Sequence, residues 1–174
     1  LIGGAPVAAN LHFREGQPEE ARTRYWKAGM LMDVIGNPGT EVEMPAEKIE
    51  EQNALAITCW LNEAMCYIKM AQNEEATGKN YKGAATGSST NPTLWRKAIE
   101  SCEVVFKLDA DNVKGHYRKG MALAHLHEFE SAKEHFEIAK RGNPASREIR
   151  TALERLRLDK AEKEAEDKAM FQKA

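Results

Sequence analysis

Apolar side chains recur along this chain at intervals of three and four residues, and no stretch alternates apolar and polar residues for long. The first pattern is the period of an α-helix and the second would indicate a strand, so the sequence predicts an all-α protein. Helices are expected over residues 7–16, 18–35, 46–72, 112–127, 130–141 and 145–174. One more is expected to begin at Pro92, with Asn91 as its cap. Pro18 suits a first helical position, and the two glutamates after it suit the first turn.

One finer spacing repeats within consecutive pairs of these helices. Intervals of twelve, four and three residues separate Ala9, Ala21, Tyr25 and Ala28, and again Gly120, Ala132, Phe136 and Ala139, with Pro144 five residues later. A middle copy consists of Ala64, Tyr67, Ala98, Cys102 and Val105, with 22 residues inserted between its halves. Small residues allow two antiparallel helices to approach closely, and an aromatic ring fills the gap between them. This spacing, with its A-x3-F…P ending, is that of the tetratricopeptide repeat (TPR).

The prediction is therefore three TPR hairpins stacked as a right-handed superhelix, followed by a long C-terminal capping helix. The expected segments are 1–144 for the repeats (about 2–35, 46–110 with an inserted loop 73–90, and 111–144) and 145–174 for the last helix. Ile149, Leu153 and Leu156 are expected to cover the third hairpin. Beyond Leu158 the helix is expected to be solvated, with Met170 and Phe171 contacting a partner.

Composition narrows the possible functions. The formal charge is −2, which disfavours a general nucleic-acid binder, and no apolar run approaches the length of a membrane span. The three cysteines form no CxxC pair, which indicates reduced thiols in the cytoplasm. No phosphate-loop, metal-ligand or catalytic-triad pattern occurs, so neither an active site nor a cofactor is expected. The chain begins with Leu1 rather than Met, so we expect it to be part of a longer protein.

Candidate binding residues lie on the first helix of each predicted hairpin, because those helices line the concave surface of stacked hairpins. The polar candidates are Asn10, Asn62, Lys114 and Arg118, and the apolar residues that follow three positions later are Phe13, Met65 and Met121. Two cations with amide donors suit a ligand rich in carboxylates. The alternative is that these polar residues are ordinary solvated helix surface.

Several stretches resemble the TPR domains of the large immunophilin co-chaperones, of the FK506-binding-protein and cyclophilin types, and of the related aryl-hydrocarbon-receptor-interacting proteins. They are Leu61–Lys69, Asp111–Gly120, Glu128–Lys133 and Asp167–Phe171. The resemblance implies a protein-interaction module that binds the acidic Met-Glu-Glu-Val-Asp tail of heat-shock protein 90, or that of heat-shock protein 70. It also implies a peptidyl-prolyl isomerase domain upstream in the parent protein.

Carried over residue by residue, the resemblance makes Asn10, Asn62, Lys114 and Arg118 a carboxylate clamp. The family usually has a lysine four residues before the first asparagine, where this chain has Pro6. That difference predicts a weaker clamp. Other interpretations are a TPR scaffold without a clamp that binds another protein or self-associates, an enzyme with its site in the groove, and a calmodulin-binding C-terminal helix. Against the last, Arg147–Lys173 has eight basic and seven acidic residues, where a strongly basic helix would be required.

Overall fold

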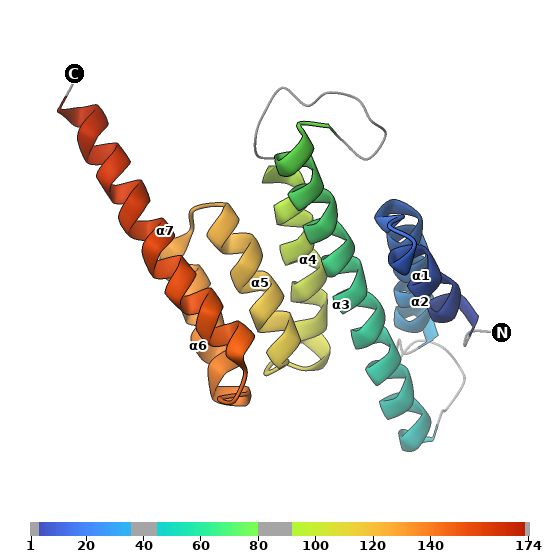
Figure 1. Ribbon diagram of the computed structural model, residues 1–174. Helices are drawn as coiled ribbons and strands as arrows, with labels where there is room; N and C mark the ends of the chain where they lie inside the picture. Colours follow the sequence, from blue (N-terminus) through green and yellow to red (C-terminus); the bar gives the residue numbers. More distant parts are fainter. Residues whose placement is uncertain (1–3, 36–44, 80–91, 173–174) are drawn as a thin grey trace. The chain divides into compact units, whose positions relative to one another are not determined.

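The computed structural model describes residues 4–35, 45–79 and 92–172, which form seven α-helices and no β-strand (Figure 1). The all-α prediction is therefore confirmed for the described residues. The chain divides into two compact units, Leu1–Ala110 and Asp111–Ala174, called here the first and the second unit. The first contains α1 (Gly4–Arg14), α2 (Pro18–Ile35), α3 (Ala46–Thr77) and α4 (Pro92–Leu108). The second contains α5 (Val113–His125), α6 (Phe129–Gly142) and α7 (Arg147–Phe171).

Helix α3 is longer than the sequence pattern predicted. A loop was expected from residue 73, but 73–77 continue the helix, which ends at Gly78 with φ of 64°. The added turn is held by packing, because Glu74 is buried and the Glu75 carboxylate accepts a hydrogen bond of 2.8 Å from the Trp95 indole. The remainder of the predicted loop, 80–90, and the Asn91 cap lie outside the described residues.

Each helix of the first unit packs against the next one in the sequence. Close approach of α2 and α3 requires Gly29, since a Cβ at that position would lie 2.7 Å from the Trp60 ring. Trp60 and Leu61 of α3 also form a buried cluster with Val105 of α4. The small and aromatic positions of the repeated spacing are buried here as predicted, and so are all three cysteines.

The second unit consists of the α5–α6 hairpin and α7, which packs mainly on α6. Asn112 caps α5 by accepting the Gly115 N–H at 2.9 Å. Within the hairpin, Gly120 allows Phe136 to approach, because a Cβ at that position would lie 2.7 Å from the Phe136 ring. The expected close contact between a small residue and an aromatic one is thus present in this hairpin.

Helix α7 begins after Ser146, whose hydroxyl accepts the Ile149 N–H at 3.3 Å. Ile149 and Leu156 are buried, as expected for residues that cover the last hairpin. Leu153 is half-buried, so it covers the hairpin less completely than the other two. The physical reason is that Leu153 lines an open groove between α6 and α7 rather than the closed contact between them.

Candidate functional site

On α1, Asn10 is exposed and held in one orientation. The Tyr25 hydroxyl of α2, which is buried, donates a hydrogen bond of 2.5 Å to Asn10 Oδ1. This contact occupies one lone pair of the amide oxygen and fixes the amide so that the Nδ2 group, which donates up to two hydrogen bonds, is available to a ligand. Pro6 is the third residue of the same helix. Helix α1 therefore offers an oriented amide donor at Asn10. It lacks the lysine that the resembled family usually has at the position of Pro6.

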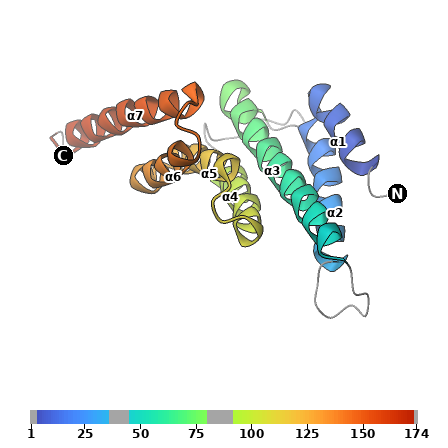
Figure 2. The ribbon, with the colours of Figure 1, turned by 90° about the horizontal axis from the view of Figure 1, so that it is seen from below.

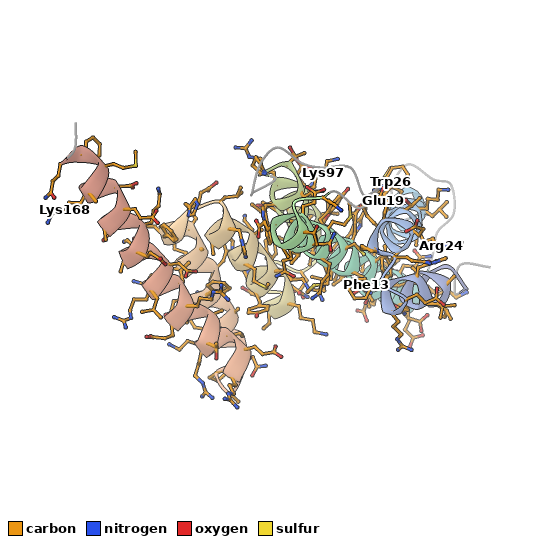
Figure 3. All side chains as sticks on the ribbon, turned by 45° about the horizontal axis from the view of Figure 1, so that its top comes forward. Phe13, Glu19, Arg24, Trp26, Lys97 and Lys168 are labelled. Atoms are coloured by element: carbon orange, nitrogen blue, oxygen red, sulfur yellow. The ribbon has the colours of Figure 1, made fainter. Side chains whose placement is uncertain are left out.

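Phe13 and Asn62 are related through one apolar cluster to which α1, α2 and α3 all contribute. Cys66, one turn after Asn62, joins a buried cluster with Ala9, Ala21 and Tyr25, against which Phe13 packs. Figure 3 labels Phe13 on its helix, α1. Asn62 and Met65 are half-buried on α3. The first unit thus brings its four sequence-predicted site residues, Asn10, Phe13, Asn62 and Met65, to two helices joined by one apolar cluster.

Next to Asn62, a buried charge network connects α2, α3 and α4. The Glu63 carboxylate is 3% exposed, accepts the Ser101 hydroxyl at 2.9 Å and lies 3.9 Å from the Arg22 guanidinium. Burial raises the pKa of Glu63, and the Ser101 hydrogen bond and the Arg22 charge lower it by smaller amounts. Arg22 is held by Glu19 at 2.8 Å and donates to the Tyr67 hydroxyl at 3.3 Å.

Sequence reasoning missed this network. Its signal was a glutamate in the middle of the apolar stretch Leu61–Ile68, since a carboxylate at a core position needs a partner. The network fixes the turn of α3 that contains Asn62.

The second unit holds the cationic residues of the predicted set. Lys114 is the second residue of α5 and is exposed, and Arg118 follows one turn later and is half-buried. Their spacing places both on one face of the helix. The N-terminal turn of a helix also attracts anions, because its free N–H groups carry partial positive charge. Met121 is half-buried on the same helix.

A histidine pair lies between α5 and α6. The rings of His116 and His135 stack with centroids 5.0 Å apart, and their Nδ1 atoms are 2.7 Å from each other. At that distance one nitrogen donates and the other accepts. The sequence placed these histidines on separate helices without predicting the pair. Within the described residues, no three His, Cys, Asp or Glu side chains are arranged to hold a metal ion.

The structure therefore places the sequence-predicted residues in two sets. Asn10, Asn62, Phe13 and Met65 belong to the first unit, and Lys114, Arg118 and Met121 to the second. The assignment of these seven residues to one binding site stays a prediction. None of the helices in the described part combines the length and low polarity needed to cross a bilayer.

Comparison with known proteins identifies both curated relatives and similar solved structures. No protein-family model matches the chain. The peptidyl-prolyl cis-trans isomerase FKBP4 of Rattus norvegicus is 24% identical over 143 residues, which cover 82% of this chain and 25% of FKBP4. The chain thus spans about a quarter of the length of the curated relatives it matches.

Solved structures are similar over almost the whole chain. The C-terminal TPR-containing domain of the Plasmodium falciparum putative FK506-binding protein PFL2275c has a TM-score of 0.67 and 25% identity, covering 93% of this chain and 91% of that one. The first TPR domain of Spaghetti (RPAP3), bound to the HSP90 peptide SRMEEVD, has a TM-score of 0.61 and 18% identity, with 92% and 93% covered. This chain has the fold of a TPR domain. The resemblance to immunophilin TPR domains noted in the sequence is confirmed.

Proposed function

We propose that this TPR domain is the docking module of a co-chaperone and binds the acidic C-terminal peptide of heat-shock protein 90, or that of heat-shock protein 70. Asn10 and Asn62 would donate hydrogen bonds to the peptide, and Lys114 and Arg118 would hold its carboxylates. Phe13, Met65 and Met121 would contact its apolar side chains. The RPAP3 domain, which is bound to such a peptide, supports this ligand class.

The observation that carries the proposal is the orientation of Asn10. An exposed asparagine whose oxygen already accepts from a buried tyrosine has both of its Nδ2 hydrogens available to a ligand. Such a group suits an acceptor such as a peptide carboxylate. The exposed Lys114 in the first turn of α5 has the same preference for an anion.

Pro6 reduces the expected affinity. A charged hydrogen bond contributes about 1.5–3 kcal/mol, and the usual lysine is absent at this position. Loss of one such bond corresponds to a roughly tenfold weaker complex or more. Pro6→Lys is therefore expected to strengthen binding of the acidic peptide, and since residue 6 lies in the first turn of α1, the substitution is tolerable there.

The direct test is calorimetry with the peptide SRMEEVD and with the same peptide amidated at its C-terminus. We expect micromolar binding that weakens as salt rises, a loss of about 2 kcal/mol or more for Arg118→Ala, and little binding of the amidated peptide. Arg96→Ala, at an exposed cation of α4, is the matched control and should bind normally. Equal binding of both peptides, or of wild type and a Lys114→Ala, Arg118→Ala variant, would exclude a clamp.

A double-mutant cycle tests whether both units contact one peptide. If Asn62 and Arg118 hold the same carboxylate-rich segment, the losses from Asn62→Ala and Arg118→Ala should not be additive. Simple additivity would indicate two uncoupled contacts, whereas no loss of affinity from either variant would support the scaffold interpretation, in which the groove recognises another protein.

We also propose that the longer protein contains a peptidyl-prolyl isomerase domain and acts in the cytoplasm. The similarity to FKBP4, of which this chain covers 25%, supports this. The residues of this chain would then serve docking rather than catalysis, and the isolated chain should show no isomerase activity in a proline-peptide assay.

A further inference from the structure

Helix α7 continues beyond the hairpin on which it packs. Its buried residues, Ile149 and Leu156, lie in its first half, and the last contact with α6 is the ion pair between Lys160 and Glu130 near the start of α6. Figures 1 and 2 both show the end of α7 projecting past α6, and Figure 3 shows Lys168 on this projecting part. Residues 161–171 thus have no packing partner within the second unit.

The face of α7 that covers the hairpin extends into this projecting part. Intervals of four and three residues connect Ile149, Leu153, Leu156, Lys160, Glu164, Asp167 and Phe171, which therefore share one side of the helix. Phe171 at the end of this stripe is 84% exposed, and Met170 beside it is 70% exposed. A helix surface with apolar residues at both ends and charges between them is unusual for a purely solvated segment.

A groove of about 450 Å³ lies between α6 and α7, beside the first half of the same stripe. Its apolar residues are Phe129, Leu153 and Leu156. Its charged residues are five cations, Lys133, Lys140, Arg150, Arg157 and Lys160, and three carboxylates, Glu130, Glu137 and Glu154. Lys133 and Arg150 form no ion pair with any residue that the structure describes. The groove therefore has an apolar floor and an excess of positive charge.

The projecting end of α7 has the opposite character. Residues 161–171 contain four carboxylates and two lysines, and they end in Met170 and Phe171. We propose that two copies of this chain associate through antiparallel α7 helices, so that the end of each α7 occupies the α6–α7 groove of the other copy. This surface is separate from the residues of the peptide-binding proposal.

The sequence fixes a register for this pairing. When Phe171 of one copy lies opposite Leu153 of the other, Asp167 lies opposite Arg157 and Glu164 opposite Lys160. In an antiparallel pair each of these contacts occurs twice, as a two-fold symmetric interface requires. The existing ion pairs of Lys160, Arg157 and Lys163 on α7 are exposed, so exchanging partners costs little.

Sedimentation equilibrium of the 174-residue chain tests the association. We expect a monomer–dimer equilibrium whose Kd rises severalfold from low to high salt. Phe171→Asp should raise the Kd about tenfold or more, because it places a carboxylate in the apolar contact. The matched control is Leu158→Asp: Leu158 is also exposed on α7, at 55%, but lies about 140° around the helix from Leu153. A monomer at all concentrations up to about 1 mM, or equal effects of the two variants, would overturn the proposal.

Cross-linking tests the register. Residues 153 and 171 on one helix are about 27 Å apart, so a disulfide between cysteines at these positions can form only between copies. The three native cysteines are buried and should not compete. Leu153→Cys with Phe171→Cys should give a covalent dimer on mild oxidation, and Leu158→Cys with Phe171→Cys should give little. Equal yields of covalent dimer from the two variants would place the interface elsewhere and refute this one.

Discussion

The first and second units hold their helices together by different means. The first unit buries polar groups that reach across helices: Ser101 binds Glu63 between α4 and α3, and Trp95 binds Glu75 between the same two helices. In the second unit the ion pairs of α6 and α7 lie at the surface, and the polar contact between His116 and His135 joins α5 to α6 but not to α7. Directional buried contacts fix helix rotation more tightly than apolar contacts do, because each unmade hydrogen bond carries a penalty.

This difference matters for the candidate site residues. In the first unit, Asn10 is oriented by Tyr25, and Asn62 lies beside the Glu63 network. In the second unit, Lys114 is exposed in the first turn of α5. The first unit therefore supplies preorganised amide donors, whereas the second supplies a long flexible cation that can adapt to its ligand.

The largest expected effect on stability comes from removing a large buried aromatic side chain from the core of each unit. Trp95→Ala and Phe136→Ala should each lower the free energy of unfolding by about 3–5 kcal/mol, since both side chains are buried. Hydrogen exchange should show the loss of protection mainly in α3 and α4 for the first variant and in α5 and α6 for the second. A uniform loss of protection in both variants would mean that the two units unfold as one.

Three leucines of α7 give a graded test within the second unit. Leu156→Ala should cost about 2–4 kcal/mol, the half-buried Leu153→Ala about 1 kcal/mol, and Leu158→Ala less than about 0.5 kcal/mol. Urea denaturation measures all three at a protein concentration low enough to keep the chain monomeric. If Leu153→Ala lowered the free energy of unfolding as much as Leu156→Ala does, the groove beside Leu153 would have to be closed in solution.

A smaller effect is expected on the pH dependence of stability, and it comes from Glu63 in the first unit. Because burial raises the pKa of Glu63, the folded state binds its proton more tightly than the unfolded state does. The Glu63 contribution to stability is therefore greatest below the unfolded-state pKa and is lost as pH rises toward the folded-state pKa. Glu63→Gln should remove this decline and be no less stable than wild type at pH 7.

Glu63→Ala is the matched comparison. It removes the hydrogen bond from Ser101, whose hydroxyl keeps the Lys97 carbonyl at 3.1 Å as an acceptor, and it opens a cavity at a buried position, so it should cost about 1–3 kcal/mol at pH 7. Thermal unfolding of the three proteins from pH 4 to pH 8 measures both effects. A wild-type stability that rises with pH faster than that of Glu63→Gln would contradict the raised pKa.

Much of this fold could be predicted from the sequence because the relevant signals are local or strictly spaced. Ala9, Ala132 and Phe136 follow from the repeat interval, and Pro18 from the chemistry of a helix start. The end of α3 could not be predicted, because it depends on Glu75 reaching Trp95 twenty residues further along the chain. A helix boundary set by such a distant contact leaves no periodic signal.

The candidate site was predictable as a set of residues but not as an arrangement. The spacing identified Asn10 and Asn62, whereas the partners that orient them, Tyr25 and the Glu63 network, are contacts between different helices. The repeat spacing identifies Tyr25 only as a core position. Its hydroxyl adds a polar role that the repeat pattern, which specifies size and apolarity, does not encode.

The smallest change, removal of the Tyr25 hydroxyl, tests whether the orientation of Asn10 contributes to peptide binding. Tyr25→Phe keeps the buried ring and frees the Asn10 amide to rotate, so the chain should stay folded but bind the acidic peptide about five- to tenfold more weakly. Asn10→Ala should weaken binding at least as much, and Tyr117→Phe in the second unit serves as the control with unchanged affinity. Calorimetry with SRMEEVD measures all three. If Asn10→Ala lost affinity while Tyr25→Phe bound like wild type, the amide would contribute without being preorganised, and the distinction between the two units would not extend to binding.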